Sequence, residues 1–319
     1  MFRTFISFVV LQALAVTALA EAGLWQSNSD LARVRLISAT DGVPQSGQLN
    51  LGLEFEISPG WVTYWKIQGP VGVPLTADWG QSVNIASANI QYPLPERYTY
   101  TVPGLDDESM ESFVYREHLV LPIEIEVVDP NQPVTAMANL QFTVCGELCI
   151  FTDAQVRIDL FPGSEGRSAE AEIIKAFRDQ VPPLPLAESP GLALIGHTFH
   201  EEKGVLEYQL ESIQPLQSPD VFIGSNFGGF VFGRPEISLS KDATQALVQV
   251  PMTSGGFGGE TPANTDIYVT IADAGRGVDL GFIRTGDPES FMPRLQDGTF
   301  EVQSASTGFW NQLETLLGL

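Results

Sequence analysis

Two cysteines, Cys145 and Cys149, are the residues of this 319-residue sequence whose type and spacing best suit redox chemistry. Residues four apart on one continuous strand would lie about 13 Å from each other, which is beyond the reach of a disulfide. If residues 146–148 form a three-residue hairpin loop, however, the two cysteines face each other, with Cα atoms about 4.5–5.5 Å apart. The spacing therefore predicts a cross-strand disulfide at the tip of a hairpin.

The residues that flank the cysteines alternate in a way that supports this hairpin. One face would carry the mostly apolar pairs Val144–Ile150, Phe142–Thr152 and Leu140–Ala154. The other face would carry Gln141–Asp153, Thr143–Phe151 and Cys145–Cys149. Because the cysteines fall on the more polar face at the tip, we expect both of them to be accessible.

A disulfide of this kind is either a redox centre or an inert structural bridge. Its five-residue loop would stabilise the fold by only about 2 kcal/mol, against about 3 kcal/mol for a fifteen-residue loop. Short cross-strand disulfides also exchange readily with other thiols. We therefore predict that Cys145 and Cys149 are catalytic, in an exchange reaction that needs no bound cofactor. Because the spacing differs from Cys-x-x-Cys at a helix start, no helix dipole is expected to lower a thiol pKa.

Other side chains are candidates for supporting roles near the cysteines. Trp61, Tyr64 and Trp65 could shield the disulfide, although aromatic residues near a sandwich strand are also typical of the core. His118 could protonate a leaving thiolate, or it could be an ordinary residue at the edge of a strand. Each alternative predicts a different position relative to the sulfur atoms.

The net charge of the chain and its small number of histidines restrict which functions are possible. The chain has 16 basic and 39 acidic residues and a net charge of −23, so it repels phosphate backbones and is not expected to bind nucleic acid. With three histidines in the sequence, no dedicated metal site is predicted. Cu(I) binding by the reduced cysteines with His118 is an alternative, because soft thiolates suit Cu(I). Glu147 and Asp153 carry charges that would raise the pKa of a nearby thiol.

The first twenty residues have the pattern of an export signal. Arg3 supplies the positive start, Phe5 to Val16 is apolar but too short to span a bilayer, and Ala18-Leu19-Ala20 fits a signal-peptidase site. We expect residues 1–20 to be removed and the remaining chain to be exported to a periplasm-type compartment, where a disulfide persists. An uncleaved membrane anchor is the alternative.

Short alternating segments then predict an all-β fold. Residues 21–165 are expected to form an antiparallel β-sandwich that holds the cysteine pair. Its expected strands lie within Ala32 to Ser38, Leu49 to Ile57, Leu119 to Val128 and Leu140 to Leu160. Residues 191–290 are expected to form a second β-sandwich. Its expected strands include Val205 to Leu210, Glu236 to Leu239, Ala246 to Val250 and Asp266 to Ile271.

Residues 166–190 predict a short helix followed by a proline-rich linker. Ser168 would cap the helix, and its apolar stripe would consist of Ile173, Ile174, Phe177 and Val181. Prolines that begin at Pro182 would end it. Residues 291–319 are expected to form a tail with a short amphipathic helix at its end, which either docks on the body or contacts a membrane surface.

Four segments of the sequence, taken together, resemble a known family. They are Val144-Cys-Gly-Glu-Leu-Cys-Ile150, Gly60-Trp-Val-Thr-Tyr-Trp-Lys66, Gly69-Pro-Val-Gly-Val-Pro74 and Tyr115-Arg-Glu-His-Leu-Val-Leu-Pro122. They resemble the periplasmic N-terminal region of DsbD/ScsB-type thiol:disulfide interchange proteins. The stretch from Val221 to Leu239, with Phe232-Gly-Arg-Pro-Glu236, resembles the second periplasmic domain of the ScsB-like branch, so the similarity covers roughly residues 30 to 285.

The resemblance implies an immunoglobulin-like domain in which Cys145 and Cys149 relay reducing equivalents to exported thioredoxin-like proteins, a setting sometimes linked to copper tolerance. Family members usually continue into a membrane domain and a thioredoxin-like domain, so we expect the electron donor of this chain to be a separate membrane protein. A truncated or repurposed form of the family is the alternative. A non-catalytic protein-binding module with a structural disulfide is the rival hypothesis. Which cysteine is attacked first, and what the second domain contributes, are questions for the structure.

Overall fold

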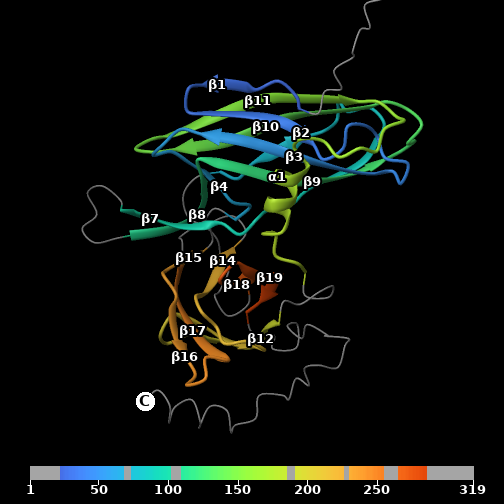
Figure 1. Cartoon of the computed structure of the whole chain (residues 1–319). Coiled ribbons are helices and arrows are strands. Elements are labelled where there is room, and N and C mark those ends of the chain that lie inside the picture. The colour runs from blue at the N-terminus through green and yellow to red at the C-terminus, as the bar shows by residue number, and fades with distance from the viewer. Residues whose placement is uncertain are drawn as a thin grey trace, which may run out of the picture.

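The computed structural model describes residues 22–67, 73–101, 109–184, 191–225, 230–254 and 265–285. Within these ranges the chain forms nineteen strands and one short helix. The strands build two antiparallel β-sandwiches, which lie one above the other in Figure 1. The all-β class expected from the sequence is therefore confirmed, whereas the expected signal at 1–20 and the tail at 291–319 lie outside the described residues.

The first sandwich consists of two sheets. The first sheet has the strand order β1 (Gln26–Ser29), β2 (Ala32–Ser38), β3 (Gln48–Ile57), β9 (His118–Val127) and β6 (Ile85–Ile90). The second sheet has the order β11 (Cys149–Leu160), β10 (Val134–Cys145), β4 (Val62–Tyr64), β8 (Ser109–Arg116) and β7 (Glu96–Thr101), and β5 (Thr76–Asp78) also pairs with β10.

A continuous apolar core fills the space between these two sheets, because alternate side chains of each strand point inward. Phe55 of β3 and Phe142 of β10 meet edge to face across it, with ring centroids 5.3 Å apart. The β10–β11 hairpin is therefore fixed to the opposite sheet by its inward-facing residues.

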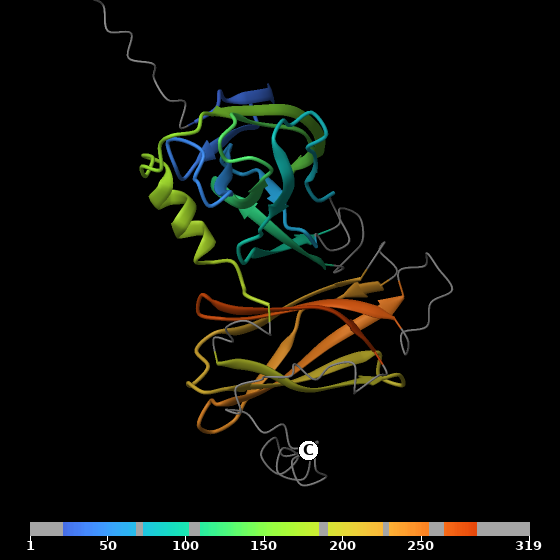
Figure 2. The same ribbon diagram turned by 90° about the vertical axis from the view of Figure 1, so that its right-hand side faces the viewer.

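The helix α1 (Ala171–Arg178) covers the outer face of the first sheet, where Ile174 packs against Ile37 and Val120. Gly52 permits this close approach, since a Cβ atom there would lie 2.7 Å from a methyl group of Val120 and 3.1 Å from Ile174. Figure 2 shows the helix along the side of the first sandwich, with the chain continuing from it towards the second.

Both ends of this helix differ from the sequence-based expectation. Glu170, rather than Ser168, occupies the N-cap position and makes no side-chain capping hydrogen bond. The Ser168 hydroxyl instead accepts a hydrogen bond from the Glu170 N–H and donates one to the carbonyl of Ser38, which attaches the helix start to β2. The helix ends at Arg178, so Val181 lies beyond it.

The second sandwich has its own apolar core between two further groups of strands. One group contains β12 (Leu192–His200), β13 (Val205–Ser212), β17 (Gln245–Ser254), β15 (Phe230–Phe232) and β16 (Glu236–Leu239). The other contains β14 (Pro219–Ser225), β18 (Asp266–Asp273) and β19 (Arg276–Arg284). The four strands expected in this region lie within β13, β16, β17 and β18.

The two sandwiches touch through an aromatic contact. Phe222 of β14 packs edge to face against Trp65 and Phe113 of the first sandwich, with ring centroids 5.8 and 5.2 Å apart. In the part of the chain that the structure describes, no helix has the length and apolar character needed to cross a bilayer.

Candidate functional site

The cysteine pair lies at the tip of the β10–β11 hairpin, as the spacing predicts. Cys145 and Cys149 are directly opposed and form a disulfide with an S–S distance of 2.05 Å and a Cα–Cα distance of 4.1 Å. Residues 146–148 form the loop between the strands. Every flanking pair expected from the sequence is present in the hairpin, from Val144 opposite Ile150 to Leu140 opposite Ala154.

The two sulfur-bearing residues differ in exposure, which corrects the expectation that both are accessible. Cys145 is 4% exposed, because β4 pairs with β10 on the side away from β11 and places Val62 beside it. Cys149 is exposed, because it begins β11, which is the edge strand of its sheet. An approaching thiol would therefore reach Cys149 first.

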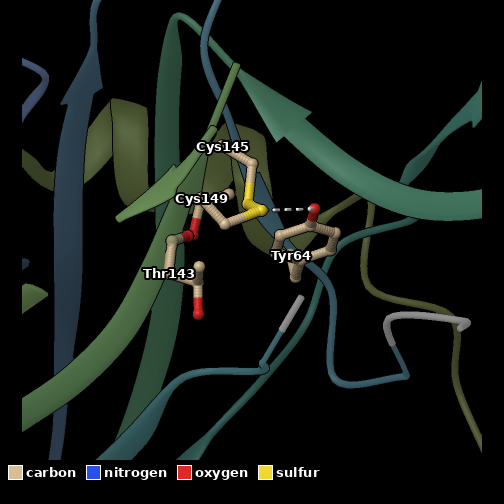
Figure 3. Close-up of a disulfide and its surroundings, with 5 residues drawn as sticks. Tyr64, Thr143, Cys145 and Cys149 are labelled. Carbon is tan, nitrogen blue, oxygen red and sulfur yellow. Dashed lines mark hydrogen bonds between the residues drawn. A yellow bond between two sulfur atoms is a disulfide. The ribbon is translucent and has the colours of Figure 1, made fainter. Parts of the chain in front are cut away.

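The three aromatic candidates have three different positions. Tyr64 lies against the disulfide, and its hydroxyl is 3.9 Å from the Sγ atom of Cys149 (Figure 3). Trp65 is fully buried in the core. Trp61 packs over the hairpin loop, where a Cβ atom on Gly146 would lie 3.2 Å from its ring. The shielding hypothesis therefore fits Tyr64, while the core hypothesis fits Trp65.

The position of Tyr64 follows from strand pairing. Side chains directly opposite each other on neighbouring strands share a face of the sheet, as do residues two apart along one strand. Cys145 pairs with Val62, so Tyr64, two residues further along β4, lies on the same outer face. Thr63 between them points inward, and its hydroxyl donates to the carbonyl of Thr143, 3.0 Å away, which ties β4 to the cysteine strand.

Tyr98 of β7 completes the surroundings of the disulfide and was missed by the sequence analysis. It packs against a small buried cluster that consists of Val62, Tyr64, Val114 and Cys145. The guanidinium of Arg116 lies over the Tyr98 ring, 4.9 Å from its centre, and pairs with Glu96 at 3.2 Å. The alternation of residues 96–101 could have indicated a strand, but Tyr98 is far from the cysteines in sequence.

His118 is not part of this site. It lies on β9 in the other sheet, where its Nε2 atom is 2.9 Å from a carboxylate oxygen of Glu54 and its ring packs against Phe177 of the helix. These contacts place its side chain on the helix-covered face. They favour the ordinary structural role considered for His118 over the role of proton donor or copper ligand.

Two acidic residues of the hairpin, Asp153 and Glu147, differ in their positions relative to the cysteines. Asp153 is on the same outer face as Cys149, but four residues along β11, or about 13 Å away. There its carboxylate accepts a hydrogen bond from Gln141, at 3.0 Å. Glu147 is exposed in the loop between the cysteines. Among the described residues, no group of three or more His, Cys, Asp or Glu side chains is arranged to hold a metal ion.

Exposed apolar side chains flank Cys149 in the chain. Leu148 is 72% exposed, Phe151 is 75% exposed and Ile150 is 38% exposed. Phe151 lies on the same face as the disulfide, because it is two residues from Cys149 on β11. The accessible sulfur therefore has an apolar rim, which is the type of surface that is enriched at protein contact sites.

The fold and the site define a class of protein: tandem antiparallel β-sandwiches with a cross-strand disulfide at an edge hairpin of the first. The family model described as thiol:disulfide interchange protein DsbD, N-terminal, matches residues 33–159. The match supports a thiol:disulfide interchange domain, in the general sense, at these residues. Residues 180–284 match a domain of unknown function (DUF8393).

The same tandem architecture occurs in a solved structure. The crystal structure of the N-terminal periplasmic domain of ScsB from Proteus mirabilis superposes with a TM-score of 0.64 at 22% sequence identity, and the match covers 84% of this chain and 99% of that one. At this identity the likeness shows a common fold. No curated protein sequence matches this chain.

Proposed function

We propose that this protein relays reducing equivalents by thiol–disulfide interchange through Cys145 and Cys149, with exported thioredoxin-like proteins as acceptors. The observation that supports this proposal most directly is the unequal exposure of the two cysteines within one disulfide. An exposed sulfur can accept an incoming thiolate, while its 4%-exposed partner leaves and is kept away from competing thiols. A purely structural bridge requires no such difference.

The proposed reaction begins with a donor dithiol protein. One of its thiolates attacks the Sγ atom of Cys149, the Cys145–Cys149 bond breaks, and Cys145 departs with the electron pair as a thiolate. The second donor thiolate then attacks the donor sulfur of the mixed disulfide and releases Cys149. The donor is oxidised to a disulfide, and this chain gains two electrons and two protons as a dithiol.

The reduced pair then acts on the acceptor by the same chemistry. The Cys149 thiolate attacks the acceptor disulfide, one acceptor sulfur leaves as a thiolate, and Cys145 resolves the mixed disulfide. The acceptor leaves as a dithiol and the Cys145–Cys149 bond is restored. Both exchanges require close contact between proteins, which the exposed apolar side chains of Leu148 and Phe151 beside Cys149 support.

Trapping tests this proposal and its order of attack. In a Cys145→Ser variant the resolving thiol is absent, so mixed disulfides between Cys149 and thioredoxin-like proteins should accumulate when the variant is expressed with its export signal. The Cys149→Ser variant retains only the buried thiol and should trap far less. If neither variant captures a thioredoxin-like protein at a controlled redox poise, the relay proposal is wrong.

The reduction potential separates the relay from a structural clip in a non-catalytic binding module. A structural disulfide has a potential below about −300 mV, whereas an exchanging pair has a higher one. Equilibration of the purified protein with glutathione or dithiothreitol buffers measures this value. We expect it to lie above the structural range, and a value below that range would favour the binding module.

A further inference from the structure

Strand β7 is an edge strand whose two faces meet different parts of the molecule. Its sheet ends with β8 and then β7, so β8 is the strand to which β7 is paired in the described structure. Tyr98 points to the outer face and packs on the cluster that contains Cys145. Its neighbour Arg97 points to the opposite face. In Figure 1, β7 and β8 lie on the side of the first sandwich that faces the second.

The second sandwich binds Arg97 with several groups at once. The guanidinium contacts both carboxylate oxygens of Asp220, with Nη2 to Oδ1 at 2.7 Å and Nε to Oδ2 at 3.2 Å. Nη2 also donates to the carbonyl of Val221, at 2.9 Å. The guanidinium lies over the rings of Phe113 and Phe222, 5.3 and 5.5 Å from their centres. A planar guanidinium is suited to this two-pronged contact, which fixes orientation as well as position.

This contact attaches β7 at a second point. The Arg97 side chain is only 14% exposed, so its charge is largely removed from water and is compensated by Asp220 of the second sandwich and by Glu111 of β8, which lies 3.5 Å away. Without Asp220, β7 is held by its pairing with β8, to which the Arg97–Glu111 contact belongs, and the strand can open locally at the edge of the sheet. Opening would lift Tyr98 from the surface that it forms with Tyr64 beside Cys149.

Two further contacts between the sandwiches, both among the residues that the structure describes, do not involve β7. Lys66 pairs with Asp279 at 2.5 Å, and the Asp279 carboxylate also accepts a hydrogen bond from the Tyr268 hydroxyl. Burial, together with the Asp279 charge, raises the pKa of Tyr268, so this hydroxyl stays protonated and continues to donate. Phe222 remains packed on Trp65. Loss of the Arg97 contact would therefore release β7 without separating the two sandwiches.

We propose that the second sandwich acts as a clamp on β7, through Arg97 and Asp220, and thereby keeps Tyr98 on the cluster that buries Cys145, so that a thiol can approach the disulfide only from the side of Cys149. Arg97 is then a positioning residue, which acts through Tyr98. This role goes beyond the exchange reaction, because it concerns access to the sulfur and is measured with a small-molecule thiol in the absence of any protein partner.

The test is the second-order rate constant for reduction of the disulfide by dithiothreitol in the full-length protein. Arg97→Ala should raise it by about tenfold, which corresponds to about 1.4 kcal/mol in the opening of β7. Asp220→Asn removes the carboxylate by which the second sandwich binds Arg97, keeps the Arg97–Glu111 pair within the sheet and leaves β7 unaltered in sequence, so it should have the same effect. Combining the two substitutions should add little, because both remove one interaction.

Asp279→Asn is the matched control, since it weakens a different ion pair between the sandwiches, Lys66–Asp279, and does not touch β7. It should leave the dithiothreitol rate within about twofold of the wild-type value. Arg97→Lys keeps the charge but loses the two-pronged geometry, so it should restore part of the protection. Amide hydrogen exchange at residues 96–101 should rise in Arg97→Ala and Asp220→Asn, and not in Asp279→Asn.

Two results would overturn the clamp. One is an unchanged dithiothreitol rate in Asp220→Asn, which is the decisive variant if Arg97→Ala does not fold. The other is an equal rise in Asp279→Asn, which would show that any loosening of the interface exposes the disulfide. The proposed exchange function is judged separately by the trapping experiment, so either idea can fail alone.

Discussion

The two faces of the β10–β11 hairpin are formed by alternate residues of the same two strands, and they have different tasks. The inward face, with Phe142 and Val144, is buried in the core of the first sandwich. The outward face has the disulfide, the exposed Phe151 and, further along, the hydrogen-bonded pair Gln141 and Asp153. The strand period of two thus separates residues that determine stability from residues that are available for chemistry.

The largest expected effect is on the inward face. Phe142→Ala would remove a ring that is 3% exposed and that packs against Phe55, so it should lower the free energy of unfolding by about 3–5 kcal/mol. Phe151→Ala on the outward face should change it by less than about 0.5 kcal/mol. Denaturant unfolding of the first sandwich measures both values. Equal losses from the two substitutions would contradict the division of tasks between the faces.

A smaller effect is expected on the rate of thiol–disulfide exchange with a partner protein. Phe151→Ser should slow exchange with a thioredoxin-like protein by about tenfold, equivalent to 1.4 kcal/mol of lost apolar contact, while reduction by dithiothreitol stays unchanged. Stopped-flow or quench kinetics with both reductants separates these rates. Phe161→Ser is the control, because Phe161 is 57% exposed and follows the other end of β11. If Phe161→Ser slowed protein exchange as much, the rim around Cys149 would have no special role.

The smallest expected effect concerns charge on the outward face. The Asp153 carboxylate lies about 13 Å along the strand from Cys149, beyond the Debye length of about 10 Å at 0.1 M salt. Asp153→Asn should therefore leave the pH dependence of Cys149 alkylation nearly unchanged. Glu147→Gln, in the loop between the cysteines, should shift this dependence further, towards lower pH. The pH dependence of alkylation in the reduced protein measures both, and a larger effect of Asp153→Asn would reverse this ranking.

The hairpin was predictable from sequence because its information is local. Alternation of apolar residues selects the face, and a three-residue loop then determines every pair from Cys145–Cys149 to Leu140–Ala154. The burial of Cys145 was not predictable in this way, because Val62 and Tyr64 come from a strand about 80 residues earlier. The residues next to a cysteine in the sequence do not reveal which distant strand will lie beside it in the sheet.

Polar contacts between residues that are far apart in the sequence were the hardest to predict. Arg97 and Asp220 are 123 residues apart and belong to different sandwiches. Neither residue lies in a motif, and the chain has many more carboxylates than cations, so the sequence offers Arg97 many equivalent partners. The helix start shows the same limit, because Ser168 has a suitable side chain for capping but is held by the carbonyl of Ser38.

The strand pairing between β10 and β11 has a consequence for the reduced protein. Eleven residue pairs, from Val134–Leu160 to Val144–Ile150, hold the two strands together before the cysteines are reached. Reduction of the disulfide therefore releases only a three-residue loop, and both thiols should keep the positions that they have in the disulfide. The hairpin can then gain or give up two electrons almost without changing shape, and the next partner meets the same surface in either state.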